Sequence, residues 1–340
     1  MKTSNMAICC MTMATHLWVP LPCRASYFDM ALKQDSIYTP GKINLALKLT
    51  KEAEIEGEYH FNVNIYVAET LMRRQTLPAR NEEPTVFELE FPAVRSRTGV
   101  RCRVELFLNG QFIETKEKPL ALWPPMVSCF GDFITEKVIW VFDISGGLQQ
   151  FFKDLKIETV DATFQAARDF GIPDIILVGQ DTDPNNMQVI IHRLMSVGSN
   201  PVVVFFRQKQ LPKNATSEIT IKDDHIQKVV CEINSPLLAG LNKSDIMNML
   251  DDAMCVKVRK GANKDISIDS YVTKVVKNGR NVYSYLCTVT DKGQVTIYCQ
   301  LNVTEGQDPR SAILLANLLR FADRINDSQD DQTDFHGERR

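Results

Sequence analysis

Residues 138–155, VIWVFDISGGLQQFFKDL, begin the stretch that decides the fold of this chain. Val138–Phe142 is a continuous β-branched and aromatic run, typical of a strand that helices cover on both faces of a parallel sheet. Ser145-Gly146-Gly147 breaks the run. Apolar residues then recur from Leu148 to Leu155 at i, i+3, i+4 and i+7, which predicts an amphipathic helix.

The same alternation repeats up to residue 206. Asp174–Val178 predicts a second buried strand, Met187–Leu194 carries a second apolar helical stripe, and Pro201–Phe206 predicts a third strand. Strands that alternate with helices favour right-handed βαβ crossovers. The sequence therefore predicts a doubly wound α/β domain, which we place at residues 137–325.

A two-residue period precedes this domain, from Ile43 to about Leu122. Such alternation predicts half-buried strands, and Asn109-Gly110 is a dipeptide preferred in tight hairpins. Five or more short strands predict an all-β immunoglobulin-like sandwich over residues 37–124. Because Trp123-Pro124-Pro125 reads as a linker, we expect two separable folding units.

Both ends of the chain are expected to lie outside the two domains. Residues 1–36 are predicted to be a leader, either disordered or a signal peptide, because an interrupted apolar stretch precedes Cys23-Arg24-Ala25. The location therefore stays open between cytoplasmic and exported. Asp308 and Pro309 predict the start of a last helix that ends near Arg324, and the acidic residues 326–340 are predicted to be disordered.

Composition argues against several classes of partner. The formal net charge is −3 and no long basic run occurs, so binding of nucleic acid is not favoured, and the apolar N-terminal stretch is too interrupted for a membrane span. The nine cysteines include no C-x-x-C pair. We therefore predict no metal site and no cofactor, and we interpret most cysteines as small buried residues.

Three segments of the second domain carry a resemblance to a known family: Asp174–Gly179, Asn234–Leu241 and Lys292–Phe321. They resemble the flavodoxin-like fold of class I glutamine amidotransferases, in the variant appended to bacterial glycoside hydrolases related to family 2 β-galactosidases. The Leu108-Asn109-Gly110 turn and the Trp123-Pro124-Pro125 exit resemble the immunoglobulin-like modules that precede this domain. The resemblance implies the C-terminal region of a longer glycosidase, without its catalytic (β/α)₈ barrel.

The nucleophile of an active amidotransferase is missing. In that family the central strand ends in a Gly-x-Cys-x-Gly elbow, whereas here Phe206 is followed by Arg207-Gln208-Lys209. The His-x-Glu string at His336 lies in the polar tail, and neither Cys129 nor Cys255 has a base nearby in the sequence. We therefore predict no catalytic residue.

Residues at the predicted strand ends remain as candidates for ligand binding, because doubly wound sheets bind ligands there. The candidates are Ser145, Gly146, Gly147, Gln180, Asp181, Arg207 and Gln208. Two glycines before a helix could present amides to an anion, or form a plain turn. For Asp143, Asp181 and Asp183 we favour turn or helix-cap roles, and for His192 a hydrogen-bonded structural role. Tyr59, Tyr66 and Trp123 could stack on a sugar, although packing is the commoner role.

The sequence thus predicts a non-catalytic accessory region of a carbohydrate-processing glycosidase system, active in scaffolding, oligomerisation or ligand contact. The expected partners are a second copy, a glycosidase catalytic subunit or a carbohydrate ligand. The rival hypothesis is an active hydrolase with an unrecognised site at the strand ends. An elbow-like turn at Arg207, or a cluster of Asp143 and Asp181 with a histidine, would favour the rival.

Overall fold

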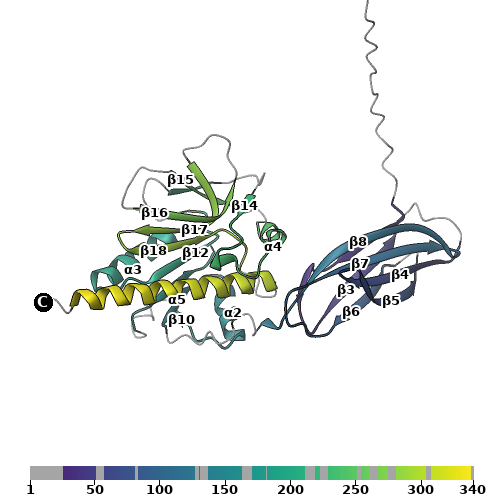
Figure 1. Cartoon of the computed structure of the whole chain (residues 1–340), viewed down its shortest axis with the longest axis horizontal. Coiled ribbons are helices and arrows are strands. Elements are labelled where there is room, and N and C mark those ends of the chain that lie inside the picture. The colour runs from purple at the N-terminus through teal and green to yellow at the C-terminus, as the bar shows by residue number, and fades with distance from the viewer. Residues whose placement is uncertain are drawn as a thin grey trace, which may run out of the picture.

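The computed structural model describes most of the chain beyond the first 25 residues. The described residues are 26–50, 57–80, 83–126, 130, 137–162, 171–180, 182–210, 219–222, 229–250, 254–259, 266–274, 281–303 and 308–337. Strands are the commonest element among them, arranged as a β-sandwich followed by a larger mixed sheet with helices (Figure 1).

Two sheets form the sandwich. The smaller has the strand order β1 (Phe28–Leu32), β3 (Gly41–Leu49), β6 (Thr85–Phe91), and the larger has the order β2 (Ser36–Tyr38), β8 (Gln111–Trp123), β7 (Thr98–Leu108), β4 (Tyr59–Val67), β5 (Thr70–Pro78). Alternate residues of each sheet share one core, where the rings of Phe28 and Phe61 lie 5.3 Å apart. The two-residue period is therefore confirmed as half-buried strands.

The hairpin between β7 and β8 follows from its two turn residues. Asn109 and Gly110 both have positive φ, 47° and 79°. Both central residues of a type I′ turn need this conformation, which suits the right-handed twist of the flanking strands. The hairpin predicted from Asn109-Gly110 is confirmed.

The second part is built on five parallel strands. Their order across the sheet is β10 (Val160–Asp161), β9 (Ile139–Phe142), β11 (Ile175–Val178), β12 (Val202–Phe206), β18 (Gln294–Cys299). Every residue of β9, β11 and β12 is buried, as continuous apolar runs require. On one face these strands pack against α2 (Gly147–Asp154) and α5 (Pro309–Gly337), and on the other against α3 (Pro184–Ser196).

Antiparallel strands extend this sheet beyond β18. β17 (Asn281–Asp291) pairs with β18, with β15 (Cys255–Arg259) and with β16 (Ile266–Lys274), and these in turn pair with β13 (Ile219–Lys222) and β14 (Val229–Cys231). The short helix α4 (Lys243–Asn248) follows the 3₁₀ turn Pro236–Leu238 and begins with a capping box between Asn242 and Asp245.

Two predictions about the chain ends differ from the structure. β1 and Ser36, the first residue of β2, fall within residues 1–36, so this part of the predicted leader belongs to the sandwich. α5 continues to Gly337 instead of ending near Arg324. The polar residues that follow Arg324 therefore extend the helix, whereas they were predicted to be disordered. Its predicted start is confirmed, since the Asp308 side chain accepts a hydrogen bond of 2.9 Å from the Arg310 N–H.

The last residue of β8 joins the two parts. Leu120 and Leu122 pack in the sandwich core, whereas Trp123 packs in the core of the second part and is 1% exposed. The Trp123 indole N–H donates to Ser36 Oγ (2.7 Å), and its carbonyl accepts from Thr39 Oγ1 (2.8 Å). One strand therefore contributes to both cores, because successive side chains point to opposite faces.

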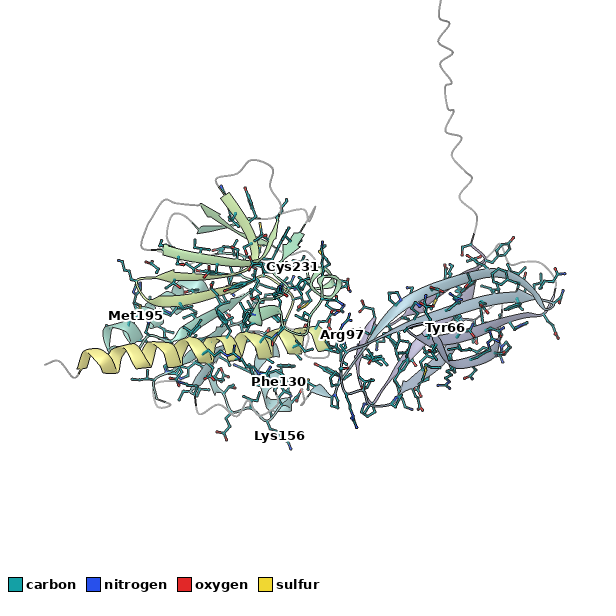
Figure 2. All side chains as sticks on the ribbon, in the orientation of Figure 1. Tyr66, Arg97, Phe130, Lys156, Met195 and Cys231 are labelled. Carbon is teal, nitrogen blue, oxygen red and sulfur yellow. The ribbon has the colours of Figure 1, made fainter. Side chains whose placement is uncertain are left out.

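Ionic contacts surround this joint. The Arg310 guanidinium bridges Asp35 of the sandwich (3.0 Å) and Asp308 (2.8 Å), and its side chain is only 10% exposed. Arg97, at the sandwich end in Figure 2, pairs with Asp245 of α4 at 3.0 Å and lies over the Trp123 ring. Each pair between the two parts has one buried partner, Arg310 in the first and Asp245 in the second. Separating the parts would remove the counter-ion of a buried charge, so these contacts disfavour independent unfolding.

Replacing Trp123 with Ala is expected to lower the free energy of unfolding by about 3–5 kcal/mol, the usual cost of removing a buried aromatic side chain. Phe112→Ala, at the exposed start of the same strand, should cost well under 1 kcal/mol. Urea denaturation followed by circular dichroism measures both. Equal small losses would contradict the role assigned to Trp123.

Candidate functional site

The carboxyl ends of β9, β11 and β12 meet at one edge of the parallel sheet. Each strand is followed directly by residues predicted to contact a ligand. In an open α/β sheet, side chains at this edge line the usual ligand crevice.

Asp143 fills the turn after β9. Its Oδ1 accepts from the Ser145 N–H (3.1 Å) and hydroxyl (2.6 Å), and its Oδ2 accepts from the Leu148 N–H at 2.7 Å. The carboxylate thus caps α2, as predicted for Asp143. Of the three amides at Ser145-Gly146-Gly147, only the Ser145 N–H donates to this carboxylate. The Gly146 N–H donates to the Asp143 main-chain carbonyl (3.1 Å) and the Gly147 N–H to Ser145 Oγ (3.4 Å), so all three are used within the turn.

Gly179 after β11 allows the cap to form. A Cβ atom on this residue would lie 2.5 Å from Asp143 Oδ1, closer than any side chain tolerates. The glycine therefore lets the two strand ends approach each other. Next to it, Gln180 is half-buried, and Asp181 lies outside the described residues.

The turn after β12 is held by Gln208. This side chain is 2% exposed, and its Nε2 donates to the carbonyls of Gly179 (2.8 Å) and Phe206 (2.9 Å). The Gln208 carbonyl accepts in turn from Gln300 Nε2 at 3.3 Å. Gln208 therefore links the ends of three strands, and its side chain amide is used within the protein.

Arg207 adopts a left-handed backbone conformation in this turn. Its φ is 45°, and its N–H donates to the Cys299 carbonyl at 2.8 Å. The left-handed region is sparsely populated by residues that carry a Cβ, and such strain persists only where neighbours enforce it. Within the described part of the chain, the half-buried Arg207 side chain makes no hydrogen bond or ion pair.

The thiols that the structure describes are unsuited to nucleophilic chemistry. Burial raises the pKa of Cys102, Cys287 and Cys299 to about 12, so these thiols stay protonated at neutral pH. Cys255 is also buried, whereas Cys231 is partly exposed. Four of these five described cysteines are therefore small buried residues as predicted, Cys231 is only half-buried, and Cys129 lies outside the described residues.

The candidate histidine and aromatic residues do not gather at the strand ends. His192 is exposed on α3, and within the described part of the chain it makes no hydrogen bond of the kind predicted for it. Tyr59 and Trp123 are buried in the cores, which leaves Tyr66 as the accessible ring of the three considered for sugar stacking. His225 lies outside the described residues, and so does the side chain of His336.

None of the helices in the described residues is long and apolar enough to cross a membrane. No group of three or more His, Cys, Asp or Glu side chains in the described ranges is placed to hold a metal ion.

Comparison with known proteins gives only weak likenesses. No protein-family model and no curated protein matches the sequence. A β-glucuronidase from Parabacteroides merdae is 10% identical with a TM-score of 0.24, over 53% of this chain and 34% of that one. A chain from the complex of Zinc 2-glycoprotein and prolactin-inducible protein from human seminal plasma is 10% identical with a TM-score of 0.23, over 30% of this chain and 98% of that one.

A CARDB domain from Pyrococcus furiosus, in complex with di-metal ions, is 11% identical with a TM-score of 0.22 over 28% of this chain and 84% of that one. The chain thus spans about a third of the glucuronidase and most of the two smaller chains. Likenesses this weak assign neither a family nor a function.

Arg207→Gly is expected to raise the free energy of unfolding by roughly 0.5–1 kcal/mol. Glycine adopts positive φ without a Cβ clash, and this gain exceeds its loss of chain entropy. Lys209→Gly, two residues on and without a positive φ, is the matched control and should not stabilise the protein. Urea titration of both variants checks this, and a loss of stability in Arg207→Gly would contradict strain at Arg207.

Proposed function

We propose that the chain is a non-catalytic accessory region of a carbohydrate-processing glycoside hydrolase system. It would act by scaffolding, association with a catalytic subunit or contact with a carbohydrate ligand. The main support for a non-catalytic role is the position of Arg207. It follows the central strand, where the family that the sequence resembles has its nucleophile. A guanidinium stays protonated in proteins and cannot attack a carbonyl or an anomeric carbon.

The proposal also assigns each of the two parts to a known type of fold. We infer that the parallel strands form a flavodoxin-like, class I amidotransferase-like domain and that the sandwich is immunoglobulin-like. Numbered along the chain, the parallel strands have the order 2-1-3-4-5, which is the doubly wound order of flavodoxin-like sheets. The helices on both faces and the antiparallel extension beyond β18 support the same assignment.

A second candidate function is hydrolysis at the strand ends. The left-handed φ of Arg207 favours it, because a strained turn after the central strand is how α/β hydrolases expose a nucleophile. The side chains at the edge weigh against it, since Asp143 is used as a helix cap and Gln208 as a strand link. A catalytic elbow also needs a base beside it, and the described histidines lie elsewhere.

The purified chain is expected to release no ammonia from glutamine and no phenol from an aryl β-galactoside above the buffer rate. Coupled absorbance assays measure both, with Arg207→Ala and Asp143→Ala in parallel. Turnover by the natural sequence that disappears in either variant would contradict the non-catalytic proposal. Turnover unaffected by both would point to a contaminating enzyme.

The accessory role has its own test. Light scattering at micromolar concentration measures self-association, and affinity purification from the source cells measures association with a barrel-containing glycosidase. We expect a stable dimer or a glycosidase in the eluate. A monomer that recovers no glycosidase would contradict the scaffolding part of the proposal.

A further inference from the structure

The outer face of the five-stranded sheet carries a cluster of polar side chains around one tyrosine. On β4 the residues Phe61, Val63 and Ile65 point into the sandwich core, so Asn64 and Tyr66 point outward. Arg103 of β7 and Arg74 of β5 lie opposite Asn64 in the register, and Arg101 lies opposite Tyr66. We name these five residues the Tyr66 patch: Asn64, Tyr66, Arg74, Arg101 and Arg103. In Figure 2 Tyr66 lies on the sandwich, away from the helices.

Asn64 has an unused hydrogen-bond donor. The residue is 0% exposed, its Oδ1 accepts from Arg74 Nε at 2.8 Å, and its Nδ2 has no hydrogen-bond partner among the residues that the structure describes. A buried amide donor without a partner is unfavourable, because it has lost its hydrogen bonds to water and gained none. The Asn64 Nδ2 is therefore ready to donate a hydrogen bond to an acceptor of a ligand, which reaches it when the exposed Arg74 side chain moves aside.

Arg74 is the cation of the patch that lacks a carboxylate within the described part of the chain. Arg101 pairs with Glu69 at 2.8 Å, and Arg103 pairs with Glu117. Arg74 is exposed and bonds only to Asn64 through Nε, which leaves the two terminal nitrogens of its guanidinium for another acceptor. A guanidinium edge of this kind matches the two oxygens of a carboxylate.

Tyr66 and its neighbours add the groups that a sugar ring requires. The guanidinium carbons of Arg101 and Arg103 lie 5.7 Å and 5.2 Å from the centre of the Tyr66 ring, so both side chains are held along the sheet. Beside them, Asn62 and Thr76 share a hydrogen bond of 2.7 Å at an exposed position. Hydrogen-bond donors and acceptors therefore lie side by side on this outer face of the sheet. Neighbouring hydroxyl groups of a sugar ring need this arrangement, because each hydroxyl both donates and accepts.

We propose that the Tyr66 patch binds a saccharide that carries a carboxylate group. The carboxylate accepts hydrogen bonds from Arg74 and from Asn64 Nδ2, and the hydroxyls of the ring bond to the polar groups beside Tyr66. The anion site rests on the geometry of Asn64 and Arg74, whereas the choice of a saccharide rests on the proposed function.

Isothermal titration calorimetry of the full chain with a galacturonate trisaccharide tests the proposal. The neutral galactose trisaccharide and inorganic phosphate are the comparison ligands. We expect the acidic trisaccharide to bind at least tenfold more tightly than either, because only it offers both a carboxylate and ring hydroxyls. Equal binding of the neutral sugar would overturn the carboxylate site, and equal binding of phosphate would overturn the saccharide.

Arg74→Ala should weaken binding of the acidic trisaccharide tenfold or more, the usual effect of losing charge-assisted hydrogen bonds. Arg73→Ala is the matched control, because Arg73 is the next residue of β5 but lies over the Phe87 ring on the other face. It should change the affinity less than twofold. Equal losses in the two variants would mean nonspecific attraction of charge and would overturn the site.

Asn64→Asp gives a second, independent test. The substitution keeps the shape of the side chain and places a carboxylate beside Arg74, so the protein supplies its own anion to the site. We expect the variant to lose its affinity for the acidic trisaccharide, while its melting temperature stays at or above that of the natural sequence. Unchanged binding would overturn the proposal. A glycosidase recovered in the association experiment would leave the accessory role standing whichever result this test gives.

Discussion

The burial of one indole holds this molecule together. Trp123 ends a strand of the sandwich, yet its ring packs in the core of the mixed sheet, and its N–H donates to Ser36 of the sandwich. The neighbouring Leu122 faces the sandwich core, so adjacent residues serve two hydrophobic cores. The ion pairs that Arg310 and Arg97 make across this joint each have one buried partner, whose charge would lose its counter-ion if the two parts separated.

At the carboxyl ends of the parallel strands, most of the polar groups already bond to other groups of the protein. Asp143 supplies the anion for the start of α2, Gly179 gives it room, and Gln208 connects neighbouring strand ends. A crevice built in this way has the layout of a ligand site, but its polar groups already have partners. Arg207 is the exception, since its backbone is strained and its guanidinium has no partner among the described residues. The sandwich face around Tyr66 differs, because there the side-chain amide of Asn64 lacks an acceptor within the described ranges.

Local pattern was enough to predict the strands and several turns. The buried runs ending at Phe142, Val178 and Phe206 and the Asn109-Gly110 hairpin depend on near neighbours in sequence, so the sequence reveals them. The joint at Trp123 depends on residues far along the chain, and Trp123-Pro124-Pro125 read as a linker instead. The sequence places Arg207 after the third strand but does not indicate its left-handed backbone, because arginine has no preference for that region. Gln208, which holds the turn, bonds to the distant Gly179. A buried outward-facing Asn64 was equally hidden, since period two predicts exposure there.

Differential scanning calorimetry of the full chain tests most directly the claim that the two parts share a core through Trp123. If they unfold together, one transition appears and its calorimetric enthalpy equals the van't Hoff enthalpy. The buried joint predicts this result. Two resolved transitions, or a calorimetric enthalpy well above the van't Hoff value, would show that the sandwich and the mixed sheet unfold independently and would contradict the claim.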